Sequence, residues 1–209
     1  MKTKLTPVLN ILKDLREERM IILVDDERRE NEGDLVISAS VVIPDHINFM
    51  ATHGRGLVCL AMSDAEINRL GFPLMVENNQ CLHNTAFTIS IDAREGVGTG
   101  ISAYDRAQTI RLAASPSSTI SDFRMPGHVF PLKARKGGLD EREGHTEAAV
   151  ELSRLAGLGN SAVICEIMDE GGHMMRLPAL LDFAKKHHLK ICRIADIKSY
   201  RNRFQKKAA

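Results

Sequence analysis

The chain has 209 residues, of which 44% are hydrophobic and 26% charged, and its formal net charge is +1. This length and composition are typical of one globular domain with a sizeable core, so we expect residues 1–209 to form a single domain. The small net charge excludes a global electrostatic attraction to nucleic acid or to an anionic membrane.

No stretch approaches the roughly 18 consecutive apolar residues of a transmembrane helix, and the N-terminus lacks the apolar run of a signal peptide. We therefore predict a cytoplasmic protein without a membrane partner. The positions of the cysteines are consistent with the reducing cytoplasm. Cys59, Cys165 and Cys192 lie inside apolar runs, and no Cys-x-x-Cys pair occurs. Neither a disulfide framework nor a zinc ribbon is expected.

Apolar periodicity and turn residues divide the chain into interleaved strands and helices. Short apolar runs predict strands at 20–24, 35–39, 57–62, 86–92, 125–132, 161–168 and 191–194. Capping residues followed by helical spacing predict helices at 6–19, 44–50, 63–70, 103–114, 145–156 and 177–188, and a solvated basic helix at 198–207. Several connections have hairpin length, so we expect an α/β fold of the α+β type, with a mixed β-sheet flanked by helices on its faces.

Residues 25–34, called the acidic loop below, contain six acids and two arginines between two predicted strands. Carboxylates at this spacing repel one another unless a cation or protons intervene, and a divalent metal ion is the simplest such cation. Asn31 and Gly33 are residue types that favour turns. The acidic loop is therefore a candidate metal site.

The segment Gly96 to Ser102 is rich in glycine and precedes a predicted helix. Glycines at a helix start let a phosphate approach free backbone N–H groups and the positive end of the helix dipole. The spacing fits neither a dinucleotide fingerprint nor a P-loop. A plain loop is thus the first interpretation of this segment, and a phosphate contact is the alternative.

Two histidines have surroundings that suggest chemistry. His145 follows Gly144 and begins a predicted helix, where a neutral imidazole can bind metal while backbone N–H groups hold a phosphate. His128 follows Gly127 at the mouth of a predicted strand, where an imidazole can relay protons near neutral pH. For each of the two, a structural role is the alternative. We expect structural or surface roles for His53, His83, His173, His187 and His188.

Glu166 interrupts an otherwise apolar predicted strand. Alternation places its side chain on the apolar side with Ile164 and Met168, which indicates a carboxylate that points into a site rather than into solvent. Together with the acidic loop, these residues suggest a phosphosugar enzyme in which a metal ion assists proton transfers on a phosphate-anchored substrate.

Five segments, taken in order, resemble the signature segments of the 3,4-dihydroxy-2-butanone 4-phosphate synthase family, namely 25–34, 75–79, 98–106, 126–132 and 144–148. The resemblance implies conversion of D-ribulose 5-phosphate to 3,4-dihydroxy-2-butanone 4-phosphate and formate in riboflavin biosynthesis. It implies Mg²⁺, or Mn²⁺ as an alternative, with two ions per site and no organic cofactor. It also implies a homodimer with sites at the subunit interface. Some relatives carry a following GTP cyclohydrolase II domain, for which 209 residues leave no room, so we expect the single-function form.

The resemblance also implies roles for individual residues. Glu30 and His145 match metal ligands, and His128, Glu166 and Glu32 match catalytic residues. Glu143 departs from the small or uncharged residue that relatives often have, and it places a negative charge beside the implied phosphate cradle of Arg142, Gly144 and Thr146. The full set of implied substrate contacts is Arg29, Glu30, Asp34, Arg142, Glu143, Gly144, His145, Thr146 and Glu166.

Two rival interpretations use the same residues differently. Another metal-dependent phosphosugar isomerase or aldolase would share the metal and phosphate sites but would release no formate. A non-enzymatic RNA-binding module would instead use the basic segment 198–207, although aromatic residues suited to base stacking make up only 4% of the chain.

Overall fold

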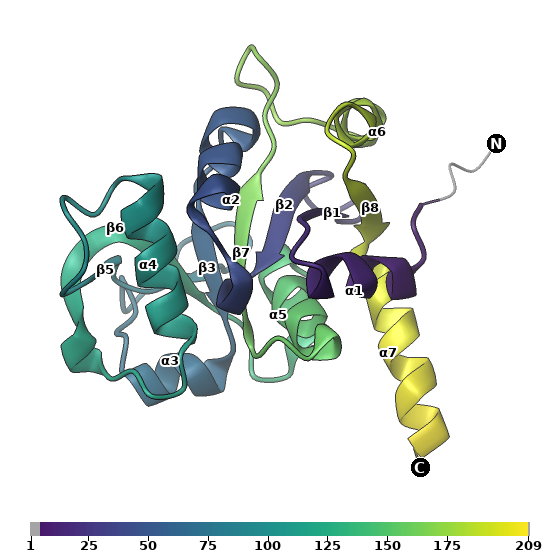
Figure 1. Cartoon of the computed structure of the whole chain (residues 1–209). Coiled ribbons are helices and arrows are strands. Elements are labelled where there is room, and N and C mark those ends of the chain that lie inside the picture. The colour runs from purple at the N-terminus through teal and green to yellow at the C-terminus, as the bar shows by residue number, and fades with distance from the viewer. Residues whose placement is uncertain (1–4, 209) are drawn as a thin grey trace.

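One mixed β-sheet organises the molecule. The structure, a computed structural model, describes residues 5–208 and the side chains of residues 5–203. Within this range eight strands form the sheet in the order β4-β6-β3-β7-β2-β1-β8, with β5 paired to β6 (Figure 1). The pairs β1–β8 and β3–β6 are parallel and the other named pairs are antiparallel, so the predicted mixed sheet is confirmed. The strands are β1 (Ile21–Val24), β2 (Gly33–Ser38), β3 (Cys59–Met62), β4 (Ala86–Phe87), β5 (Ile91–Ala93), β6 (Phe123–Lys133), β7 (Ser161–Glu166) and β8 (Lys190–Arg193).

Helices cover both faces of this sheet. One apolar cluster joins one face to α2, α3, α4 and α6, and a second cluster joins the other face to α1, α5 and α7. In Figure 1, α1 and α7 lie beside β8 at one edge, whereas α3 and α4 lie towards the opposite edge. The helices are α1 (Val8–Arg16), α2 (Pro44–Phe49), α3 (Asp64–Leu70), α4 (Ala103–Ala114), α5 (His145–Ala156), α6 (Leu177–Lys186) and α7 (Ile194–Ala208), with short turns η1 (Ala39–Val41), η2 (Met50–Gly54), η3 (Ile120–Asp122) and η4 (Gly138–Asp140).

Local chemistry explains where several elements begin. The Ser63 hydroxyl accepts a hydrogen bond from the backbone N–H of Glu66 at the start of α3, and Ser102 does the same for Asp105 at the start of α4. Strands β1 and β2 are buried along their whole length, which accounts for the apolar composition of β1 and for the central Leu-Val-Ile of β2. Each fully buried Leu or Ile in these layers contributes about 1.5–3 kcal/mol to stability.

Two predictions about β6 and the strands that pair with it are wrong in detail. The expected continuous strand at 86–92 is split into β4 and β5, which pair with different parts of β6. Strand β6 begins at Phe123, so His128 lies inside a strand and not at its mouth. The cause is a register shift in which Ile91 pairs with Val129 but the next residue of β5 pairs with Arg124, so the intervening part of β6 bulges.

The basic segment at the C-terminal end is less solvated than predicted. Helix α7 begins at Ile194, Arg201 is only 6% exposed, and its guanidinium donates to the Asp140 carboxylate at 2.5 Å. Lys198 forms an ion pair with Glu143 at 2.6 Å. Two basic side chains of this segment are thus bound to acids of the same chain.

All four cysteines are free, which confirms the prediction of no disulfide framework. Cys59, Cys165 and Cys192 are buried and Cys81 is exposed. Among residues 5–208, no helix is long and apolar enough to cross a membrane.

Candidate functional site

The acidic loop is folded around the side chain of Asp25. Its two carboxylate oxygens accept the backbone N–H groups of Glu30 at 2.9 Å and of Glu32 at 2.8 Å. Asn31 adopts a positive φ of 55°, a backbone conformation that asparagine tolerates in turns. Asp25 therefore shapes the loop from inside, and the turn chemistry expected of Asn31 is confirmed.

Two arginines hold the acidic loop closed. The Arg29 guanidinium lies 3.1 Å from the Asp25 carboxylate and 2.8 Å from that of Glu30. Arg176, in the connection between β7 and α6, donates to the backbone carbonyls of Glu30 and Asn31 at 2.6 Å each. The sequence analysis missed Arg176, since nothing local marks an arginine that contacts a loop about 145 positions away.

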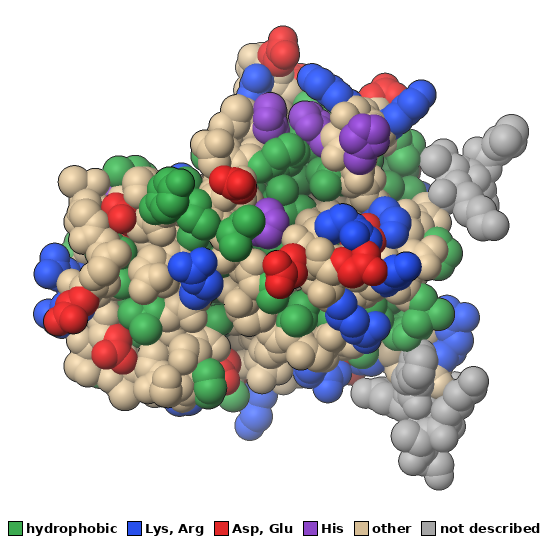
Figure 2. All heavy atoms as spheres, in the orientation of Figure 1, with side chains coloured by type: hydrophobic (Ala, Val, Ile, Leu, Met, Phe, Trp, Pro, Cys, Tyr) green, Lys and Arg blue, Asp and Glu red, His purple; other side chains and the backbone are tan. Residues whose placement is uncertain are grey.

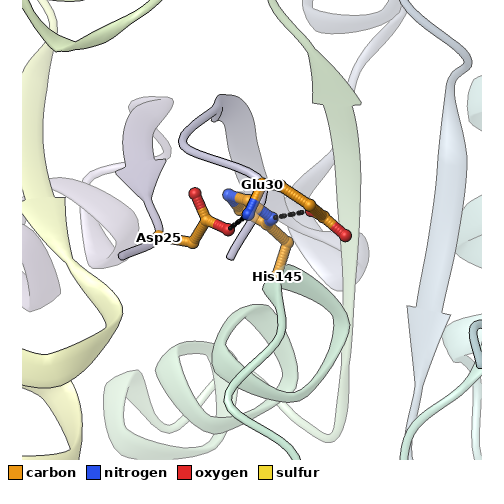
Figure 3. A group of neighbouring side chains, drawn as sticks. All are labelled: Asp25, Glu30 and His145. Atoms are coloured by element: carbon orange, nitrogen blue, oxygen red, sulfur yellow. Dashed lines mark hydrogen bonds and ion pairs between the residues drawn. The ribbon is translucent and has the colours of Figure 1, made fainter. Parts of the chain in front are cut away.

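His145, the first residue of α5, meets the acidic loop at its centre (Figure 3). Its Nδ1 lies 3.4 Å from a Glu30 carboxylate oxygen, and its Nε2 lies 3.9 Å from Asp34 Oδ1. That Nε2 atom is buried and has no hydrogen-bond partner among the described residues. The structure therefore brings the two predicted metal ligands, Glu30 and His145, into contact.

Burial and charge shift the pKa values of this group in opposite directions. Burial opposes ionisation of Glu30, but the hydrogen bond with His145 and the charge of Arg29 outweigh it and lower the pKa of Glu30 to about 2. Burial also disfavours the imidazolium, yet the charge of Asp34 and the bond to Glu30 raise the pKa of His145 to about 9. Burial raises the pKa of Asp34 to about 7 despite the nearby imidazolium. These shifts favour a positively charged imidazole of His145 between Glu30 and Asp34.

A divalent cation fits these residues in place of the imidazole proton of His145. One imidazole and several carboxylate oxygens are ligands suited to Mg²⁺ or Mn²⁺, and binding would displace the imidazole proton. Asp25, Glu30 and His145 offer ligand atoms that all lie within 4.8 Å of one another. Because both oxygens of Asp25 already accept backbone N–H groups, Glu30 and His145 are the better candidates for direct ligands.

A cavity of about 340 Å³ opens beside His145. Glu166 lies in its wall, and one of its carboxylate oxygens accepts the backbone N–H of Leu57 at 2.9 Å. Asp34 and Glu166 are direct partners in the β2–β7 register, so both side chains lie on the same face of the sheet. The lining residues are Glu30, Glu32, Asp34, Cys59, His83, Thr85, Phe87, Leu132, His145, Thr146, Ile164 and Glu166.

The start of α5 lies at this cavity, with His145 and Thr146 among the lining residues. Gly144 is the N-cap and provides no side-chain cap, so the first backbone N–H groups of α5 are left for another acceptor. The side chain of Thr146 lines the same cavity. A Cβ atom at Gly144 would lie 2.1 Å from Arg142 Nη1, which explains why glycine occupies this position.

Arg142 and Glu143 are not brought into this cavity. The Arg142 guanidinium donates to the Glu147 carboxylate at 2.6 Å, to the His83 carbonyl at 3.1 Å and to the Thr85 hydroxyl at 3.0 Å. It therefore braces two residues that do line the cavity. Glu143 pairs with Lys198 and borders a separate cavity of about 650 Å³ on the other side of the acidic loop.

The glycine-rich segment is a plain loop that binds a carboxylate of its own chain. The backbone N–H groups of Gly98 and Gly100 donate to the two oxygens of Asp105 at 3.1 and 3.0 Å. These amides are thus occupied, and the alternative interpretation of a phosphate contact is wrong for them.

His128 lies on the same face of the sheet as Glu166 but on the far side of β3. Cys59 of β3 pairs with Phe130 of β6 on one side and with Ile164 of β7 on the other. His128 lies two residues before Phe130 and Glu166 two residues after Ile164, and both steps lead toward the same end of β3. They are separated by about two strand spacings, or roughly 10 Å. His128 is not among the residues that line the 340 Å³ cavity.

Several lining residues were missed by the sequence analysis. His83, which we expected to be structural, lines the cavity with its Nε2 3.8 Å from the Glu30 carboxylate. Thr85 and Cys59 also line it. No sequence motif surrounds these residues, so their place beside the acidic loop is visible only in the folded structure.

Comparison with known proteins adds a family context to this geometry. The family model described as 3,4-dihydroxy-2-butanone 4-phosphate synthase matches residues 9–200. The riboflavin biosynthesis protein RibBA of Aquifex aeolicus is 54% identical over 202 residues, which are 96% of this chain and 50% of that protein. The 3,4-dihydroxy-2-butanone 4-phosphate synthase of Neisseria meningitidis serogroup B is 49% identical over 199 residues, 95% of this chain and 55% of that protein.

A solved structure of a 3,4-dihydroxy-2-butanone 4-phosphate synthase in complex with two magnesium ions has a TM-score of 0.91 and 38% identity to this chain. The match covers 96% of this chain and 98% of that one, which confirms the predicted α/β fold with a mixed sheet. The chain spans about half the length of the two curated relatives named above. Its description as a single-function form therefore stays a prediction.

Proposed function

The chain belongs to the 3,4-dihydroxy-2-butanone 4-phosphate synthase family, and we propose on this basis that it converts D-ribulose 5-phosphate to 3,4-dihydroxy-2-butanone 4-phosphate and formate. The reaction would serve riboflavin biosynthesis in the cytoplasm. The observation that carries the proposal is the buried His145 Nε2, which lacks a hydrogen-bond partner among the described residues and faces carboxylates at the uncapped start of α5. This arrangement supports a cation site next to a phosphate site.

Glu30 and His145 would hold the metal, with substrate oxygens and water as the remaining ligands. We propose Mg²⁺, with Mn²⁺ as an alternative, two ions per site, and no organic cofactor. When bound, the metal would polarise the ketose carbonyl and so make the neighbouring C–H acidic enough for a protein base to remove its proton.

The protein groups around the metal would bind the sugar and move its protons. The first N–H groups of α5 and the Thr146 hydroxyl would hold the phosphate, while Asp34 would orient sugar hydroxyls. Arg29, expected as a further substrate contact, borders the separate cavity and would act on the sugar through the Glu30 carboxylate that it holds. Glu166 lies beside Asp34 in the wall of the cavity, where it can accept a proton from the bound sugar. Burial and the charge of Glu30 raise the pKa of Glu32, so this carboxyl holds a proton more readily than an exposed one.

We further propose a homodimer with its sites at the subunit interface. Large apolar side chains are exposed next to site residues: Leu57 beside Glu166 and Leu82 beside His83. Such exposed patches often mark protein–protein interfaces. The apolar rim, as we call this set, consists of Leu57, Leu74, Met75, Val76, Leu82, Ile101 and Tyr104, which are 40–88% exposed.

Formate release tests the proposed reaction and separates it from its rivals. The purified protein is incubated with D-ribulose 5-phosphate and Mg²⁺, and formate is measured with a coupled formate dehydrogenase. We expect one formate per sugar consumed and no formate when EDTA is present. An isomerase or an aldolase would consume the sugar without formate.

No observation favours the RNA-binding alternative. Two basic residues of its segment, Lys198 and Arg201, are paired with acids. Figure 2 shows acidic and basic side chains interspersed over the face that is drawn, without an extended basic surface there.

A further inference from the structure

The imidazole of His83 faces the Glu30 carboxylate from the side opposite to His145. Glu30 Oε2 lies 2.8 Å from Arg29 Nη1 and 3.4 Å from His145 Nδ1. The other oxygen, Glu30 Oε1, lies 3.8 Å from His83 Nε2, which is longer than a hydrogen bond. The carboxylate of Glu30 therefore stands between two imidazoles, one at each of its oxygens.

Two arginines hold the loop that carries His83. Arg142 Nε donates to the His83 carbonyl at 3.1 Å, and Arg142 Nη2 donates to the Thr85 hydroxyl at 3.0 Å. Arg135 Nη2 donates to the Asn84 carbonyl at 3.2 Å. Three successive residues of this loop are thus fixed, although the loop lies outside the regular strands and helices.

The carboxylate of Glu147 ties these two arginines to α5. Its Oε2 accepts a hydrogen bond from Arg142 Nη1 at 2.6 Å, and its Oε1 accepts the backbone N–H of Arg135 at 3.0 Å. The Glu147 side chain is only 1% exposed, and it lies two residues after His145 in the same helix. This buried linkage therefore fixes the loop of His83 relative to the helix that carries His145.

A second imidazole changes which cations the Glu30 carboxylate can hold. Mg²⁺ takes oxygen ligands, whereas imidazole nitrogen is a ligand of first-row transition ions. The His83 side chain lines the 340 Å³ cavity and is 34% exposed, so it has room to turn toward an ion held by Glu30. The site thus offers one more nitrogen ligand than Glu30 and His145 alone provide.

We propose that His83 is a metal ligand in addition to Glu30 and His145, and that its imidazole raises the affinity of the site for Mn²⁺ relative to Mg²⁺. The proposal deepens the proposed function and rests on it, because it completes the cation site of that reaction. The alternative is that His83 is only a positively charged partner of Glu30. The two roles differ in sign, since losing a ligand weakens cation binding, whereas losing a nearby positive charge strengthens it.

The decisive variant is His83→Phe, which keeps a planar ring and the backbone carbonyl that Arg142 binds but removes both ring nitrogens. We expect the Kd of Mn²⁺, measured from free Mn²⁺ by electron paramagnetic resonance, to rise at least about tenfold. The Kd of Mg²⁺, measured by competition, should change by less than about threefold. His173→Phe is the matched control and should leave both unchanged. Its imidazole also lies 3.5 Å from a carboxylate, that of Asp169, but this pair is exposed and lies outside the cavity.

The nitrogen ligands are counted separately by pulsed electron paramagnetic resonance of Mn²⁺ bound to protein that contains ¹⁵N-histidine. We expect two bound histidine nitrogens per loaded chain in the wild type and in His173→Phe, and one in His83→Phe. A wild type with one bound nitrogen overturns the proposal even if His83→Phe fails to fold. Unchanged or tighter Mn²⁺ binding by His83→Phe also overturns it, whereas a wild type that binds no Mn²⁺ contradicts the cation site of the proposed function itself.

Discussion

At the scale of single residues, the site is a balance between buried carboxylates and one imidazole. The His145 ring lies 3.4 Å from Glu30 and 3.9 Å from Asp34, and the raised pKa of His145 favours its positively charged form beside these carboxylates. A metal ion bound in place of the proton would keep that charge balance.

Removing a proposed ligand should abolish metal binding before it affects the fold. We expect Glu30→Gln and His145→Ala each to weaken Mn²⁺ binding by at least about 100-fold and to abolish turnover, because a lost ligand is not replaced. Electron paramagnetic resonance of free Mn²⁺ measures the affinity without reference to activity. Glu27→Gln, an exposed acid of the same loop, is the control. Wild-type affinity in either ligand variant would contradict the assignment.

Residue types and their order in the chain made part of this site predictable. The acidic loop could be identified because closely spaced acids between two strands need a cation or protons. His145 could be named as a metal ligand only through the family resemblance, since a histidine at a helix start also has structural roles. His83 and Arg176 could not be predicted, because each acquires its role through a contact with a distant segment. Glu143 was assigned by its position beside Gly144, yet its side chain points to Lys198.

At the scale of elements, the acidic loop depends on Asp25 as its internal anchor. Both carboxylate oxygens are needed, since each accepts one backbone N–H of the loop. This arrangement keeps the Glu30 side chain directed at the start of α5 (Figure 3). The loop is therefore a preformed half of the site rather than a disordered acidic segment.

Asp25→Asn should loosen the loop, because an amide offers one acceptor where the carboxylate offers two. We expect the Glu30 or Glu32 amide to exchange at least about tenfold faster and the free energy of unfolding to fall by about 1–3 kcal/mol. Hydrogen exchange followed by mass spectrometry measures the first effect and urea unfolding the second. Asp26→Asn, whose side chain binds only the exposed Arg28, should leave loop exchange unchanged. Equal exchange in both variants would argue against an anchoring role.

Periodicity located most elements but not the irregular ones. Regular strands such as β1 and β7 consist mainly of consecutive apolar residues, and such runs predict a buried strand correctly. The division of the predicted strand 86–92 into β4 and β5 follows from the bulge in β6, which is set by pairing between segments over 30 residues apart. The pairing register between such distant segments cannot be predicted from the local sequence.

At the scale of the whole molecule, ion pairs join the ends of the chain to the sheet. Asp14 of α1 is 3% exposed and lies 2.7 Å from Lys190 of β8, and it also pairs with Arg19. Burial would raise the pKa of Asp14, but the hydrogen bonds from Arg19 and Lys190 lower it below its ordinary value. Ionised Asp14 therefore stabilises the fold.

The ion pairs of Asp14 predict how the free energy of unfolding changes with pH. A carboxyl with a lowered folded pKa contributes its full stability above its unfolded pKa of about 3.9 and loses that contribution as the pH falls through the folded value. Asp14→Asn should thus cost about 1–3 kcal/mol at pH 7 and progressively less below about pH 4. Urea unfolding at pH 7 and pH 3 measures both, with exposed Asp182→Asn as control. A cost that does not change with pH would refute the electrostatic origin.

The apolar rim predicts the quaternary state. Light scattering should give twice the chain mass of 23.1 kDa for the wild type, and Ile101→Asp should reduce it to a monomer. Leu9→Asp, which places the same charge on an equally exposed leucine of α1, should remain dimeric. A monomeric wild type, or a dimer that survives Ile101→Asp and a second rim variant, Leu82→Asp, would remove the rim from the interface.

The central claim is that this site removes one carbon from a phosphosugar, and an isotope label tests it most directly. D-Ribulose 5-phosphate labelled with ¹³C at C4 is incubated with the protein and Mg²⁺, and the products are followed by ¹³C NMR. We predict that the label appears as formate and that the four-carbon phosphate product is unlabelled. A label that stays in a five-carbon sugar phosphate, or enters a smaller aldol fragment, would contradict the account.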